Sequence, residues 1–174
     1  ILELDEGLAI GTSFQQTLAK PDTVLELGIT PNRAECNGYI GIARDLAAKW
    51  GQELRLPKTS PATTSSLDSS EYVQVRVQDT KCGRFTALYV RNLPKGASSP
   101  AWMQKRLEAS GMRPLSLGVD ITNYVMLEYS QPIHAYDERD IRGNLIEVRS
   151  ARPDEICKTL DGQERKMKTG DLLI

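Results

Sequence analysis

Hydrophobic residues recur with two different periods along this chain, and the order of the two periods restricts its fold. Between residues 37 and 50 they recur every three to four residues, which places them on one face of a helix that ends at Gly51. Between residues 72 and 78 valines alternate with polar residues, which predicts a strand with one buried face. Helical and strand-like stretches follow one another without regular βαβ alternation. This order predicts an α+β fold with a mixed, largely antiparallel sheet and packed helices.

Shorter patterns predict the remaining secondary structure. The serine and proline at residues 99–100 are typical of a helix start. Another helix is expected over residues 120–129, because Pro132 prevents it from continuing. The Asp-Gly pair at residues 161–162 predicts a hairpin. Further strands are predicted over residues 24–30, 84–91 and 144–149.

The length of 174 residues suits one domain, with less regular segments at two places. Residues 57–70 are rich in serine, threonine and proline and predict a flexible loop. Residues 1–20 are short and mixed, and we expect them to lead in from a preceding domain. The apolar run at residues 170–174 is strand-like, and we expect it to continue in a longer protein.

The composition excludes several classes of protein. The sequence has 22 lysines and arginines against 23 aspartates and glutamates, so its bulk charge implies no nucleic-acid partner. Three separated cysteines and one histidine lack the spacing of a zinc site, and buried reduced thiols of a cytosolic protein are expected. No apolar run approaches the length of a membrane span, and no P-loop, HExxH or GxSxG motif is present. Gly38 and Gly41 match only half of a dinucleotide fingerprint, which argues against a phosphate site there.

Polar residues gather among apolar ones in a single stretch, residues 113–137. The stretch contains the only histidine of the chain, His134. Convergent polar groups beside apolar walls are what a small-molecule pocket needs for orientation and specificity. The stretch is therefore the predicted functional region. Its polar residues include Arg113, Asp120, Thr122, Asn123, Gln131 and Asp137.

His134 has a functional and a structural interpretation. Histidine can accept or donate a proton near physiological pH, so His134 could act as a general base or orient water and carbonyl groups. The structural interpretation is a histidine satisfied by backbone groups at a strand, and it is favoured because no motif pairs His134 with a nucleophile. Asp137, three residues on, would face away in a strand and is a poor dyad partner.

Arg113, Thr122 and Asn123 also have two interpretations each. Arg113, between a helix end and a proline, could bind a phosphate or carboxylate with its guanidinium, or lie exposed against helix-end carbonyls. Thr122 and Asn123 could contact a ligand or could cap the helix that begins there. The residues alone leave these alternatives open.

Several blocks of the sequence resemble one known family. They are ITPNRAECNGYIGIARDLAAKWG at residues 29–51, GMRPLSLGVDITNYVMLEYSQPIHAYD at 111–137, LDGQERKM at 160–167 and GDLLI at 170–174. The family is the β subunit of bacterial phenylalanyl-tRNA synthetase, and the resemblance covers its B3/B4 editing region. It implies that residues 21–174 form part of a B3/B4-type editing domain and that residues 1–20 connect it to a preceding domain.

The resemblance implies that the domain hydrolyses tyrosine mistakenly attached to tRNA(Phe), within the enzyme that ligates phenylalanine to tRNA. A pocket built for a phenyl ring rejects a ring with an added hydroxyl only about a hundredfold, so a second site must remove the error. The family's pocket contains an arginine, a Thr-Asn pair and a histidine. Thr122, Asn123 and His134 are expected to position the ester and the attacking water, with His134 as candidate catalytic residue and Arg113 toward the tRNA.

The resemblance also implies what this chain lacks. The family's glutamate acceptor for the tyrosine hydroxyl and its glycine-rich pocket wall correspond to positions beyond Ile174, so poor hydrolysis by the isolated chain is expected. No cofactor is expected here, because ATP and magnesium belong to the rest of the enzyme. The expected partners are tRNA(Phe) and the α subunit in a cytoplasmic α2β2 heterotetramer, without a membrane. A non-catalytic tRNA-binding or scaffolding domain and a small-molecule binding domain are the alternatives.

Overall fold

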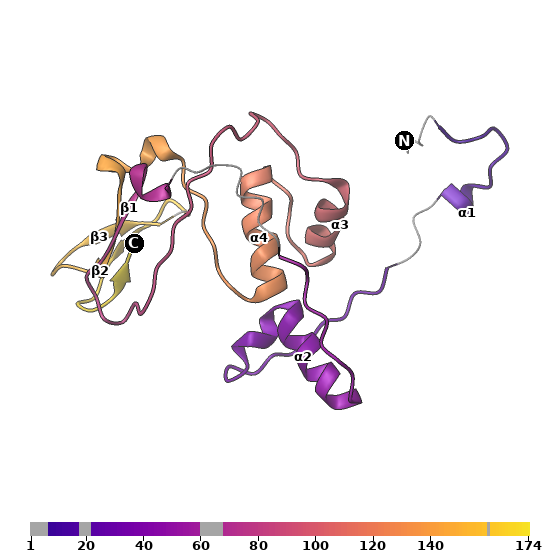
Figure 1. Ribbon diagram of the computed structural model, residues 1–174, viewed down its shortest axis with the longest axis horizontal. Coiled ribbons are helices and arrows are strands. Elements are labelled where there is room, and N and C mark those ends of the chain that lie inside the picture. The colour runs from indigo at the N-terminus through magenta and orange to yellow at the C-terminus, as the bar shows by residue number, and fades with distance from the viewer. Residues whose placement is uncertain (1–6, 18–21, 60–67, 160) are drawn as a thin grey trace.

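The computed structural model of the chain describes residues 7–17, 22–59, 68–159 and 161–174. Figure 1 shows α2, α3 and α4 in the middle of the molecule, the strands together at one end, and α1 away from the rest. The α-helices are α1 (Phe14–Thr17), α2 (Tyr39–Trp50), α3 (Ala101–Ala109) and α4 (Leu117–Tyr129). The 3-10 helices are η1 (Ala34–Asn37), η2 (Ser69–Glu71), η3 (Glu138–Asp140) and η4 (Arg142–Asn144). The strands are β1 (Gln74–Val77), β2 (Leu145–Ser150), β3 (Ile156–Lys158), β4 (Glu164–Lys166) and β5 (Leu172–Leu173).

The strands confirm the predicted mixed α+β architecture. In the described residues β2 lies between β1, which runs parallel to it, and β5, which runs antiparallel. The parallel pair needs a long connection, and α3 and α4 lie within it. The predicted Asp-Gly hairpin is confirmed as the antiparallel pair β3–β4, with Gly162 at a φ of +79° in its turn.

The predicted helices are confirmed, with two boundaries corrected: α2 begins at Tyr39, two residues after its predicted start, and α4 begins earlier than predicted. Helix α2 ends at Gly51, whose φ of +62° places it in the left-handed region that suits glycine. Helix α4 starts at Leu117, three residues before the predicted start at residue 120. Pro114 disfavours a helical conformation in the residue before it, and the extended Ser116 takes the N-cap position. Asp120 therefore lies inside the first turn of the helix, where its backbone N donates to the carbonyl of Ser116.

Few hydrophobic side chains are buried in the part of the chain that the structure describes. On α3 the side chains of Met103 and Leu107 are buried, and Leu107 is 0% exposed. On β2, Ile146 and Val148 alternate with less buried neighbours, as expected for a strand with one covered face. Among the described residues the core therefore lies mainly on α3 and β2, and Cys36 in η1 and Ala151 after β2 are also buried.

The N-terminal end of α2 approaches the C-terminal end of α4 closely. A Cβ at Gly38 would lie 2.4 Å from Ser130 Oγ, and a Cβ at Gly41 would lie 1.9 Å from the carbonyl O of Glu35. The Ser130 hydroxyl donates to that same carbonyl at 2.8 Å. Gly38 thus permits the close approach of the segment after α4, and Gly41 permits that of the segment before α2. These two packing roles account for a glycine pair that resembles half of a dinucleotide fingerprint.

Two predicted strands are wrong, and a third is less buried than predicted. Residues 24–30 and 84–91 form no strand in the structure. The second stretch instead contacts η2 and the residue after it: Tyr89 N donates to Ser69 Oγ at 3.1 Å, and the Tyr89 ring stacks on Tyr72 with centroids 4.5 Å apart. The predicted strand over residues 72–78 is β1, but its residues are exposed on both faces. The predicted loop at 57–70 lies largely outside the described residues.

Candidate functional site

Helix α4 presents Thr122 and Asn123 in its second turn, where both are half-buried. Neither caps the helix, because Ser116 is the N-cap residue. The Thr122 hydroxyl donates to the carbonyl of Val119 at 2.7 Å, which leaves its oxygen lone pairs able to accept. The Asn123 amide offers two N–H donors and one carbonyl acceptor. Two adjacent side chains can therefore supply both donors and acceptors from one rigid helix.

Arg113 is exposed in the turn between α3 and α4. Gly111, at a φ of +77°, ends α3, and Met112 N donates to the carbonyl of Leu107 at 2.9 Å. This is the Schellman pattern, in which a left-handed glycine allows the chain to bond back onto the helix. The pattern satisfies the helix-end carbonyl with backbone, so the guanidinium of Arg113 is not needed there.

His134 is exposed in the segment that follows α4. The helix ends at Ser130, which has a left-handed φ of +59°. The imidazole packs edge-to-face on Tyr136 with centroids 4.5 Å apart. The favoured structural interpretation, a backbone-satisfied histidine at a strand, is wrong, because residues 131–137 form no strand. The Asp137 carboxylate pairs with the Arg139 guanidinium at 2.6 Å. Hydrogen bonds from the side chain and the backbone N of Arg139 lower the pKa of Asp137 to about 2.

The structure brings two of the four predicted site residues together. Thr122 and Asn123 are neighbours on α4, whereas Arg113 precedes the N-terminus of this helix and His134 follows its C-terminus. A helix of 13 residues is about 20 Å long, so the two flanking residues belong to segments at its opposite ends. In Figure 1 the chain after α4 leaves toward the strands.

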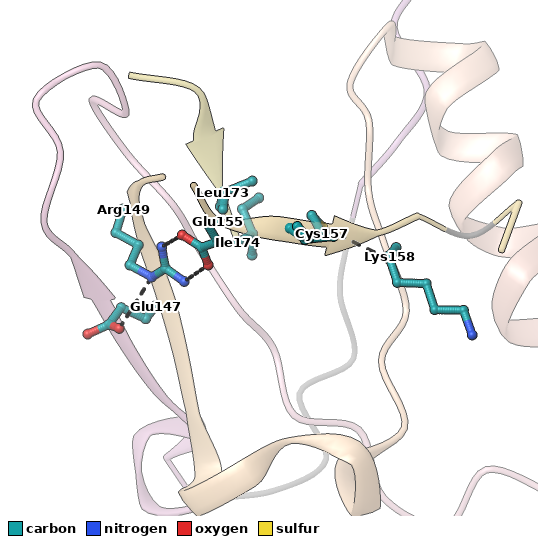
Figure 2. Close-up of a pocket in the computed structure, with 8 residues that line it drawn as sticks. Glu147, Arg149, Glu155, Cys157, Lys158, Leu173 and Ile174 are labelled. Atoms are coloured by element: carbon teal, nitrogen blue, oxygen red, sulfur yellow. Dashed lines mark hydrogen bonds and ion pairs between the residues drawn. The ribbon is translucent and has the colours of Figure 1, made fainter. Parts of the chain in front are cut away.

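A hollow of about 390 Å³ lies at the strand end of the molecule, away from these four residues. The Arg149 guanidinium forms two hydrogen bonds to the Glu155 carboxylate, at 2.8 and 2.7 Å, and Figure 2 shows this pair facing inward while Lys158 extends away. Because each charge is committed to the other, the pair stabilises the fold and offers little to a ligand. No sequence pattern singles out this pair, which the turn after β2 brings together. The hollow is lined by Glu147, Arg149, Glu155, Ile156, Cys157, Lys158, Leu173 and Ile174.

The Arg149–Glu155 pair predicts a dependence of stability on pH. Hydrogen bonds from Arg149 and from Arg152 N lower the pKa of Glu155 from 4.5 to about 2. A carboxyl with a lowered folded-state pKa stabilises the fold above its unfolded pKa and loses this contribution as the pH falls. Urea denaturation should show wild type more stable than Glu155→Gln at pH 6, with the difference shrinking toward pH 2. An equal difference at both pH values would contradict the prediction.

A second hollow, of about 640 Å³, lies beside η2 and β1 and is lined by residues that include Asp68, Ser69 and Gln74. It contains none of the four predicted site residues. The part of the chain that the structure describes holds no group of three His, Cys, Asp or Glu side chains placed to bind a metal ion. None of the helices within the described ranges is long and apolar enough to cross a bilayer.

Comparison with known proteins identifies the family. A family model for the B3/4 domain matches residues 81–174. Phenylalanine–tRNA ligase beta subunits from Geobacter metallireducens, Anaeromyxobacter dehalogenans and Fusobacterium nucleatum are 43%, 42% and 38% identical over the whole chain. The chain spans 22% of the length of each of these relatives. The chain therefore carries a B3/4 domain and belongs to the family of phenylalanine–tRNA ligase beta subunits.

Proposed function

We propose that this domain is the editing site of a phenylalanine–tRNA ligase and hydrolyses tyrosine from mischarged tRNA(Phe). The observation that carries the proposal is the B3/4 match together with the identity to β subunits over the whole chain. The polar groups of Thr122 and Asn123 support it, because a rigid helix presents them at half-buried positions.

The chemistry is the hydrolysis of an ester between the tyrosine carboxyl and a ribose hydroxyl of the tRNA. Water adds its oxygen to the carbonyl carbon, the bond to the ribose oxygen breaks, and a proton passes to that oxygen. The Asn123 amide and the Thr122 hydroxyl can hold the carbonyl and the water by hydrogen bonds. The His134 imidazole can orient the water or accept its proton.

Arg113 serves the tRNA side of the site in this proposal. Its exposed guanidinium can form two parallel hydrogen bonds to a phosphate or to the aminoacyl end. The chain carries nearly equal numbers of acidic and basic residues, so single well-placed cations must supply the local attraction for RNA.

The remaining functions belong to the rest of the enzyme. We propose an α subunit as partner, in a cytoplasmic α2β2 assembly, with ATP and magnesium bound outside this segment for the ligation of phenylalanine. The residues that recognise the tyrosine hydroxyl are likewise assigned to the subunit beyond Ile174.

Deacylation of Tyr-tRNA(Phe) tests the proposal. The full-length β subunit, assembled with its α subunit, should release free tyrosine well above the uncatalysed rate and should leave Phe-tRNA(Phe) largely intact. The 174-residue chain alone should be slower, because the proposal assigns part of the pocket to the remainder of the subunit. Absence of tyrosine release by the full assembly would end the proposal.

A non-catalytic tRNA-binding role is the second candidate. It is favoured by the exposure of Arg113 and His134 and by the two hollows, which other residues line. This role predicts that the assembly binds tRNA(Phe) through the domain, and that Arg113→Ala weakens binding while no variant changes deacylation. Binding and deacylation measured on the same variants separate the two functions.

A further inference from the structure

A buried carboxylate, that of Asp120, joins the segments around the proposed site. Asp120 is 2% exposed, and its Oδ2 accepts a hydrogen bond from Ser99 Oγ at 2.5 Å. Its Oδ1 accepts from the backbone N of Leu115 at 2.8 Å. Ser99, itself 4% exposed, lies just before α3. One side chain therefore connects α4, the turn before it and the segment before α3.

The burial of this carboxylate is costly. The two hydrogen-bond donors, the Ser99 hydroxyl and the Leu115 backbone N, are both neutral. Neither donor therefore supplies a positive charge to offset the hydration that the carboxylate loses on burial. The position in the first turn of α4 helps, because the positive end of the helix dipole favours an anion there. An apolar side chain could fill the same space without needing any partner. Buried acceptors hold their surroundings in one arrangement, because a donor that moves away leaves an oxygen unsatisfied.

The two bonds act close to the proposed site residues. Leu115 lies two residues after Arg113, so its anchored amide restrains the backbone within about 7 Å of Arg113. The same turn is otherwise tied at its two ends, by Met112 N to Leu107 O and by Leu117 N to Ala97 O. On the other side, Asn123 follows Asp120 by three residues and lies on the adjacent turn of α4.

We propose that Asp120 is a positioning residue of the editing site. It holds the turn that carries Arg113 in a fixed place relative to Thr122 and Asn123 on α4. It touches no substrate and acts through the amide of Leu115. The inference rests on the proposed function for its effect on rate, whereas the anchoring of the turn can be tested separately.

Two substitutions at Asp120 separate its hydrogen bonds from its volume. Asp120→Leu removes both acceptors at similar size, whereas Asp120→Asn can keep both bonds, because Oδ1 still accepts and Nδ2 can donate to Ser99 Oγ. In the full-length assembled enzyme, Asp120→Leu should lower kcat for Tyr-tRNA(Phe) deacylation about a hundredfold, since small displacements of reacting groups are this costly. Asp120→Asn should lower it less than about threefold. Wild-type kcat in Asp120→Leu, or equal losses in both variants, would overturn the proposal.

A double-mutant cycle with Arg113 distinguishes positioning from general stability. If Asp120 acts by holding the turn, Arg113→Ala should cost about tenfold in the wild-type background and less than about twofold with Asp120→Leu. Arg139, whose side chain is 83% exposed and pairs with Asp137, provides the matched control. Arg139→Ala should leave deacylation unchanged in both backgrounds. Equal costs of Arg113→Ala in the two backgrounds would contradict the positioning role.

Hydrogen exchange of the Leu115 amide tests the anchor without any deacylation. In the full-length enzyme this amide should be protected in wild type, Asp120→Asn and Ser99→Ala, and should exchange about a hundredfold faster in Asp120→Leu. If Asp120→Leu does not fold, Leu115→Pro removes the amide donor and leaves the carboxylate in place, and the same loss of kcat is expected. Unchanged exchange in Asp120→Leu refutes the anchor. If the Leu115 amide of the wild type is protected as expected but the enzyme releases no tyrosine, the proposed editing function is refuted and the anchor is not.

Discussion

Alanine at His134 or Asn123 is expected to lower the rate of tyrosine release from Tyr-tRNA(Phe) by about 10²- to 10³-fold in the full-length assembled enzyme. Losses of this size are typical when a group that orients water or stabilises a developing oxyanion is removed. In single-turnover deacylation, the rate constant of hydrolysis should decrease more than the affinity for tRNA. His134 is exposed and Asn123 half-buried on α4, so neither substitution opens a cavity in the core.

A nearby polar residue serves as the matched control. Gln131 is exposed three residues before His134, and its amide donates to the adjacent Pro132 carbonyl at 3.3 Å. Gln131→Ala should keep the wild-type rate, and Thr122→Ser should keep more activity than Thr122→Val because it retains the hydroxyl. Equal activity of His134→Ala, Asn123→Ala and Gln131→Ala would assign catalysis to other residues and would favour the tRNA-binding role.

The helices were predictable from sequence because local signals determine where they begin and end. The periodic stripe before Gly51 and the Ser-Pro pair at 99–100 correspond to α2 and α3. The strand predictions over 24–30 and 84–91 failed because apolar content does not guarantee a pairing partner. The second stretch contacts Ser69 in η2 and Tyr72 just after it instead of pairing as a strand.

The candidate site was less predictable than the fold. A family resemblance points to the four residues, and no spacing rule places Arg113 and His134 relative to α4. Helix α4 starts three residues before the predicted start, so Asp120 is a buried anchor inside the first turn and Thr122 lies in the second turn. Such contacts depend on the tertiary packing of α3 and α4, which periodicity in one helix cannot report.

Leu107 is the most buried of the described α3 side chains, and Leu107→Ala is expected to destabilise the helical part by about 2.7 to 5 kcal/mol. Leu107 is 0% exposed, and truncation removes buried apolar surface and leaves a cavity. A loss of about 3 kcal/mol corresponds to a change of about a hundredfold in the opening equilibrium. Hydrogen exchange of the α3 and α4 amides in the full-length enzyme should therefore accelerate by about this factor.

The control for Leu107 is the same substitution at Leu88, which is 80% exposed. Leu88→Ala removes the same atoms where water already surrounds them, so amide exchange in α3 and α4 should change by less than about threefold. Because Leu107→Ala should loosen α3, and Asp120 ties α4 to the segment just before α3, Leu107→Ala should also speed exchange at Leu115. Equal effects of the two leucine variants would mean that α3 does not bury Leu107 in the assembled enzyme. The anchor that Asp120 gives to the Arg113 turn would then lose its structural basis.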